Sequence, residues 1–130
     1  MIRWLALAAL CVACAPSHIQ MIVRTAPTAN RGLPMYLVIR TVDETKYLTE
    51  SYSSIADKIT EPDQSIVRTV EVFPGRETIF NVKLGAGQPL GMYFLFTDPG
   101  IHWRTLLEPP FGGKCMIRVE GNEIQDVVMK

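Results

Sequence analysis

The side chains that could perform acid–base or nucleophilic chemistry are few and far apart along the chain. The two histidines, His18 and His102, do not belong to a His/Cys/Asp cluster with the spacing of a metal site. The sequence contains no Gly-x-Ser-x-Gly, Walker or dinucleotide-binding pattern. We therefore expect both histidines to be ordinary surface residues. We expect no catalytic residue, no metal, no cofactor and no small-molecule substrate, so the protein is not predicted to be an enzyme.

The three cysteines occupy two different environments. Cys115 alternates with Ile117 and Val119, which favours burial as a small core residue over a reactive thiol. Cys11 and Cys14 lie instead at the end of an apolar run near the start of the chain. Three cysteines are too few for a disulfide scaffold.

Residues 1–13 have the composition of a secretory signal peptide. One cation, Arg3, precedes an unbroken apolar run from Trp4 to Ala13. A transmembrane helix needs about 20 apolar residues, and this run is much shorter. The small residue Ala13 precedes a possible cleavage point.

The end of this run, Val12-Ala13-Cys14, resembles the lipobox of bacterial lipoproteins. That resemblance implies that residues 1–13 are removed and that Cys14 carries a covalent lipid. Residues 14–17 would then form an anchor and short tether, followed by one domain over 18–130. Ala15 in place of Asp implies an outer-membrane lipoprotein facing the periplasm. The alternative is a plain signal peptide, cleaved without lipidation.

Composition excludes two further classes of protein. The 130 residues include 13 basic and 13 acidic side chains, so no net positive charge is available to bind nucleic acid. A hydrophobic content of 48% argues against disorder. The length allows one domain.

Alternating apolar and polar residues predict strands through most of the chain. Two turn signals support them: Pro74-Gly75 suits a type II turn, and Gly121-Asn122 suits a two-residue hairpin. The run at 90–97 is apolar on both faces, as in a central strand. The expected strands are 18–24, 35–42, 67–73, 79–84, 90–97, 103–108, 114–120 and 123–129.

One segment has helical periodicity instead. Leu48, Tyr52, Ile55 and Ile59 recur at spacings of four, three and four. Asp43 or Thr45 could cap the start of this helix, and Glu61-Pro62-Asp63 would end it. The sequence therefore predicts an all-β protein, an antiparallel β-sandwich of about eight strands with one short helix after the second strand.

The order of these features resembles the TssJ lipoproteins of bacterial type VI secretion systems. The resemblance covers about residues 14–128 and implies a transthyretin-like sandwich with a crossing helix. Three stretches carry it: Asn30-Arg31-Gly32-Leu33-Pro34 running into the apolar strand that ends at Arg40, Val72-Phe73-Pro74-Gly75-Arg76-Glu77, and Phe94-Leu95-Phe96-Thr97-Asp98 followed by Trp103-Arg104.

The same resemblance implies a partner. TssJ binds the periplasmic part of the inner-membrane protein TssM and tethers the secretion membrane complex to the outer membrane. Its contact lies largely in the loop between the first two strands, here residues 26–34. If that loop is not the contact in this chain, we expect it at residues 98–103. A loop that merely closes the sandwich is the alternative for this segment. For the whole protein, the alternative is a periplasm-facing lipoprotein that binds a small ligand or inhibits an envelope enzyme. The implied contact residues are Pro27, Asn30, Arg31, Gly32, Leu33 and Pro34.

Overall fold

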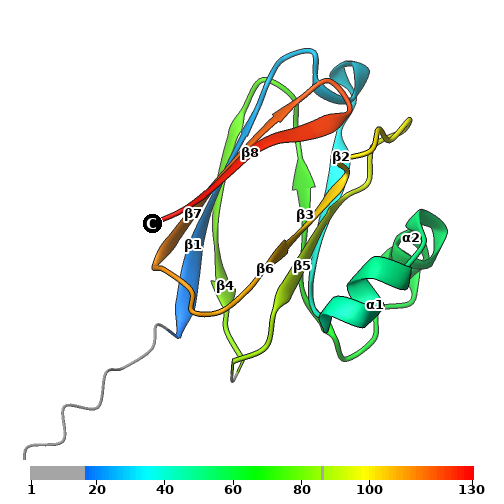
Figure 1. The fold of residues 1–130 in the computed structure, drawn as a ribbon. Coiled ribbons are helices and arrows are strands. Elements are labelled where there is room, and N and C mark those ends of the chain that lie inside the picture. The colour runs from blue at the N-terminus through cyan, green and yellow to red at the C-terminus, as the bar shows by residue number, and fades with distance from the viewer. Residues whose placement is uncertain (1–16, 86) are drawn as a thin grey trace, which may run out of the picture.

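Two four-stranded sheets pack face to face in the computed structural model, which describes residues 17–85 and 87–130 (Figure 1). The expected signal peptide and the lipid site at Cys14 lie outside the described residues. In the described part of the chain, no helix is long and apolar enough to cross a membrane.

The eight strands expected from the alternation pattern are confirmed, with small shifts at their ends. The β5 strand is central in its sheet and buried on both faces, as its double-sided apolar pattern indicates. The strands are β1 (His18–Thr25), β2 (Met35–Thr41), β3 (Ile66–Val72), β4 (Glu77–Lys83), β5 (Leu90–Phe94), β6 (Arg104–Leu107), β7 (Lys114–Glu120) and β8 (Glu123–Met129).

The first sheet has the order β4-β1-β7-β8 and the second has the order β3-β2-β5-β6. Neighbouring strands are antiparallel, with one difference from the expected all-antiparallel arrangement: β1 and β7 are parallel, with Gln20 opposite Lys114. The reason is the route of the chain. Residues 108–113 cross from the second sheet to the first at the end where β1 begins, so β7 starts beside the start of β1.

Alternate side chains of both sheets fill the space between them. Ile19, Met21 and Val23 of β1 face Leu37 and Ile39 of β2 in one continuous cluster of buried residues. Burial of apolar side chains supplies the main stabilisation of such a sandwich. The clusters that form the core lie within residues 19–129, so the chain from Ser17 onward contains the whole sandwich.

The prediction of a single helix between the second and third strands is wrong in one respect. Two helices form there, α1 (Glu44–Thr49) and α2 (Tyr52–Thr60). Asp43 caps α1 by accepting the N–H of Lys46, and Ser51 starts a second helix by accepting the N–H of Ser54. The break between them turns Leu48 outward, where 64% of its surface is exposed, although its spacing had suggested the buried face.

The sandwich has two distinct ends. The proximal end is where β1 begins at His18, and the distal end is where β1 finishes at Thr25, about 23 Å away along an extended strand. Four connections meet at the distal end, at residues 26–34, 73–76, 95–103 and 121–122. The expected contact loop therefore lies at the opposite end of the sandwich from His18, where β1 begins (Figure 1).

Candidate partner-binding surface

The loop between β1 and β2 has an unusual backbone. Three consecutive residues have positive φ angles: Asn30 (50°), Arg31 (56°) and Gly32 (76°). They belong to the 3₁₀ turn η1 (Ala29–Gly32), whose angles are non-helical at Asn30 and Arg31. Asparagine and glycine adopt this conformation readily, whereas arginine does so at a cost of about 1 kcal/mol. Contacts elsewhere in the loop must hold Arg31 there.

Asn30 supplies those contacts. Its side-chain amide donates to the carbonyl oxygens of Leu33 (2.9 Å) and Pro34 (3.2 Å), and its Oδ1 accepts the N–H of Thr97 (2.8 Å). Its backbone N–H donates to the carbonyl of Gly121. Only 3% of Asn30 is exposed, so this residue fixes the shape of the loop and does not itself face solvent.

The turn between β3 and β4 supports the same loop from its other side. Gly75 has a φ of 76° and the N–H of Arg76 donates to the carbonyl of Phe73, as the expected type II turn requires. The N–H of Gly75 donates to the carbonyl of Thr25, where β1 ends and the loop begins. Pro27 packs beside Gly75.

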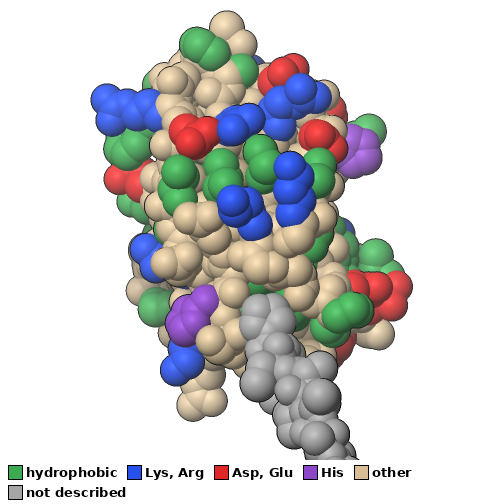
Figure 2. Space-filling view, turned by 90° about the vertical axis from the view of Figure 1, so that its left-hand side faces the viewer, with side chains coloured by type: hydrophobic (Ala, Val, Ile, Leu, Met, Phe, Trp, Pro, Cys, Tyr) green, Lys and Arg blue, Asp and Glu red, His purple; other side chains and the backbone are tan. Residues whose placement is uncertain are grey.

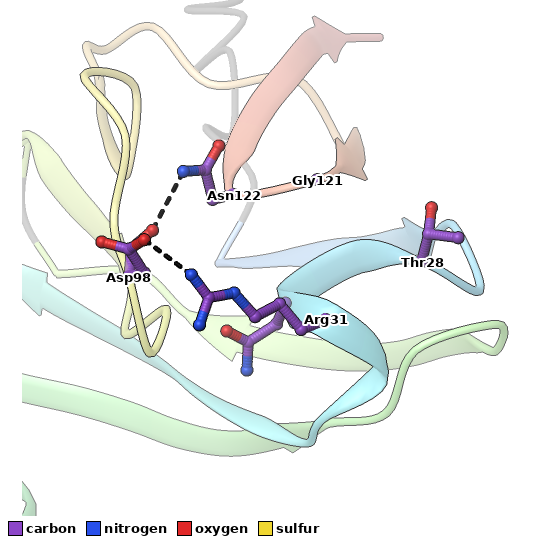
Figure 3. A pocket seen from close by; sticks show the side chains of 6 residues that line it. Thr28, Arg31, Asp98, Gly121 and Asn122 are labelled. Atoms are coloured by element: carbon purple, nitrogen blue, oxygen red, sulfur yellow. Dashed lines mark hydrogen bonds and ion pairs between the residues drawn. The ribbon is translucent and has the colours of Figure 1, made fainter.

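An exposed ion pair joins two loops that are distant in sequence. The Arg31 guanidinium lies 2.9 Å from the Asp98 carboxylate, and Asn122 donates to the Asp98 carbonyl (3.0 Å; Figure 3). Both charged side chains are mostly exposed, so their pairing is worth at most about 1 kcal/mol. A shallow pocket opens between them, lined by Thr28, Asn30, Arg31, Asp98, Gly121 and Asn122.

Apolar side chains are also exposed at the distal end. Leu33 is 49% exposed and Ile101 is 84% exposed, and they lie in the two loops that the Arg31–Asp98 pair joins. Tyr36, just inside β2, and Phe73 of the β3–β4 turn are exposed to a lesser degree. The loops that the sequence presents as alternatives, 26–34 and 98–103, thus form one continuous surface. The sequence did not indicate the pairing of Arg31 with Asp98, because the two residues are 67 positions apart.

The remaining residues with possible chemistry are accounted for by the fold. Cys115 is fully buried in the core as expected, and burial raises the pKa of its thiol to about 11. His18 and His102 are exposed, also as expected. Trp103 packs edge-on against Tyr52 of α2. Within residues 17–85 and 87–130, no group of three or more His, Cys, Asp or Glu side chains is placed to hold a metal ion.

A polar network attaches the helices to the outer face of the second sheet. Arg40 of β2 is 4% exposed and pairs with Glu50, which also accepts the Tyr93 hydroxyl (2.7 Å). Arg104 of β6 donates to the Glu50 carbonyl (3.1 Å) and stacks over Tyr47. Burial raises the pKa of Tyr93 to about 12. This network covers the second sheet, whereas the outer face of the first sheet carries no helix in the described chain.

Comparison with known proteins agrees with this architecture. The family model of the IglE N-terminal domain matches residues 36–119, most of the chain, and the chain therefore belongs to that family. A comparison with curated proteins found no match.

Several solved structures share the fold. The T6SS lipoprotein TssJ1 from Pseudomonas aeruginosa has a TM-score of 0.67 at 19% identity, covering 88% of this chain and 97% of that one. The Serratia marcescens Lip, a membrane-bound component of the type VI secretion system, has a TM-score of 0.70 at 12% identity, covering 88% and 99%. A chain of the structure described as the TssM C-terminal domain from EAEC has a TM-score of 0.66 at 18% identity, covering 85% and 97%. The protein is TssJ-like, as its sequence predicts.

Proposed function

We propose that this protein is a lipoprotein, anchored in the outer membrane through Cys14, that binds the periplasmic part of a TssM-like inner-membrane protein and so tethers a type VI secretion membrane complex. Membership of the IglE N-terminal domain family and the TssJ fold support this assignment. The names printed for similar structures, which include a TssM domain and a type VI membrane complex, point to the same machine.

The observation that carries the proposal is the geometry of the distal end. The loop at 26–34 is held rigidly by the buried Asn30, yet it presents Leu33 and Arg31 to solvent. A rigid loop loses little conformational entropy on binding, and exposed apolar and arginine side chains are the usual anchors of an interface. The distal end also faces away from the end where an N-terminal lipid would attach, so a membrane at the proximal end would leave it accessible.

The contact is tested by replacing its two proposed anchors together. Arg31→Ala with Leu33→Ala should weaken binding to the purified periplasmic part of a TssM-like protein from the same organism by about 2–4 kcal/mol, or roughly 30- to 1,000-fold. The thermal melt should change much less, because both side chains are exposed. Biolayer interferometry or calorimetry measures the affinity.

A matched control lies on the helices. Lys46→Ala with Leu48→Ala also removes one exposed base and one exposed leucine, from α1. This control should leave the affinity unchanged. Equal losses in the two double variants, or an unchanged affinity in the first with an intact fold, would reject the loop as the contact.

The anchor is tested separately. Cys14→Ser should abolish incorporation of labelled palmitate and remove the protein from the outer-membrane fraction, because a lipid supplies the membrane affinity. Cys11→Ser should have no such effect. Continued palmitate labelling of the Cys14→Ser protein would show that another residue carries the lipid.

A further inference from the structure

The outer face of the first sheet carries a row of apolar side chains where a solvated face would be polar. The row crosses all four strands in register: Ile79 of β4 is opposite Ile22 of β1, Ile22 is opposite Met116 of β7, and Met116 is opposite Val128 of β8. Ile79 is 53% exposed and Val128 is also exposed. Figure 2 shows apolar side chains side by side across this face.

Charged residues flank the row differently on its two sides. On the distal side, acids outnumber bases: Arg24 is paired with Glu77 at 2.7 Å, Arg118 is opposite Asp126, and Glu120 is opposite Glu123. On the proximal side, the outward positions of the strands carry bases without an acid. They are Lys83, Lys114 and Lys130, with His18, Gln20 and Asn81 between them.

The helices on the opposite side of the molecule carry more acidic than basic side chains. Residues 43–63, which contain both helices over the second sheet, include six acidic and two basic side chains. The chain has no net charge, so the lysines of the proximal edge are offset by acids on the helices and at the distal end.

We infer that the proximal half of this face lies on a phospholipid surface with anionic headgroups. Lysines around a shallow apolar strip are the composition of a surface that binds an anionic membrane. This inference rests on the proposed function, because a lipid on Cys14 would lie three residues before Ser17. Three residues span at most about 10 Å, which holds the basic edge of the face close to the bilayer.

Membrane binding by this face would leave the distal end free for a partner. With the proximal half of the first sheet on the membrane, the Arg31 and Leu33 surface points away from the bilayer, toward the periplasm. The acidic residues of the helices and of the distal end also turn away from the anionic surface, so the charge distribution orients the protein as well as attracting it.

The test uses the unlipidated chain from Ser17 onward, which contains the whole sandwich, and vesicles of phosphatidylcholine with or without 30% phosphatidylglycerol. Sedimentation at about millimolar lipid should show binding to the anionic vesicles that is lost in high salt, since each base near such a surface contributes about 1 kcal/mol, or about fivefold. The variant Lys114→Glu should reduce this binding at least about fivefold. Ile79→Thr with Val128→Thr should also weaken binding to the anionic vesicles, because it removes two exposed apolar side chains from the row.

The matched control is Lys46→Glu on α1, which makes the same charge change away from the face and should leave vesicle binding unaltered. Thermal melts of each variant confirm that the sheet is intact. The inference would be overturned by equal binding to neutral and anionic vesicles or by no binding to either. It would also be overturned if Lys114→Glu and Lys46→Glu changed the binding equally. Such a result leaves partner binding by the distal loop untouched, because that affinity is measured without lipid.

Discussion

The two connections that flank β2, residues 26–34 before it and residues 42–65 after it, place their apolar side chains in opposite environments. The helix segment after β2 turns Ile55 inward and buries it completely against Val38 and Tyr93. The loop before β2 is anchored by the polar side chain of Asn30 and leaves Leu33 in solvent. The connection after β2 covers the second sheet, and the connection before β2 holds an exposed apolar side chain on a rigid loop.

This difference separates stability from recognition. A segment that buries its apolar side chains contributes to the fold, and its loss costs stability. A segment that is held by hydrogen bonds while its apolar side chain stays exposed gains little from folding, which is the pattern of a binding loop. Substitutions after β2 should therefore lower stability, and substitutions of exposed residues before β2 should weaken partner binding.

The largest expected effect is on the helix cover. Glu50→Ala removes the partner of Arg40, which is buried and would be left as an uncompensated charge. We expect the free energy of unfolding to fall by about 3–5 kcal/mol, measured by urea denaturation. Glu44→Ala, at an exposed position of α1, is the control and should cost less than about 1 kcal/mol. A similarly small cost for Glu50→Ala would mean that the network does not hold the helices.

The second effect is on the loop support. Asn30→Ala removes three side-chain hydrogen bonds and places alanine at a positive φ, and should cost about 2–4 kcal/mol of stability. Asn30→Gly relieves the backbone part of that cost but not the rest. Both variants should also bind the TssM-like partner more weakly although Asn30 is buried. Full affinity in either variant, at a temperature where it is folded, would contradict the role of loop rigidity.

The smallest effect is a dependence on pH beneath the helices. Burial raises the pKa of Tyr93 from 10.0 to about 12. Between pH 10 and pH 12 this hydroxyl therefore stays protonated in the folded state but ionises in the unfolded state. The stability it contributes is complete below pH 10 and is lost as the pH rises to 12, by no more than about 1.4 kcal/mol per pH unit for one proton. Tyr93→Phe should therefore show a shallower decline over that range in chemical denaturation. Identical declines would indicate that the helices do not seal Tyr93 from water.

Local patterns in the sequence were sufficient to place the strands and several turns. The alternating pattern over residues 18–24 predicted a strand, in which Ile19, Met21 and Val23 do face the core, and Gly121 and Asn122 do connect β7 to β8 as predicted. These features depend on neighbours in the chain, so periodicity reveals them.

The features that local patterns missed all depend on distant residues. Leu48 continues the helical spacing, but the pairing of Glu50 with Arg40 and the cap at Ser51 interrupt the helix there. The burial of Asn30 follows from contacts with Thr97 and Gly121, which no spacing within the loop indicates. The parallel pairing of β1 with β7 likewise depends on a crossing formed late in the chain.

Hydrogen–deuterium exchange of the chain with and without the periplasmic part of a TssM-like protein tests the central claim most directly, because it maps the contact without choosing residues in advance. If the distal loops hold the partner, amide exchange on binding should slow at residues 26–34 and 98–103, while residues 44–60 exchange at the same rate in both samples. Protection confined to the helices or to the outer face of the first sheet, with residues 26–34 unchanged, would contradict it.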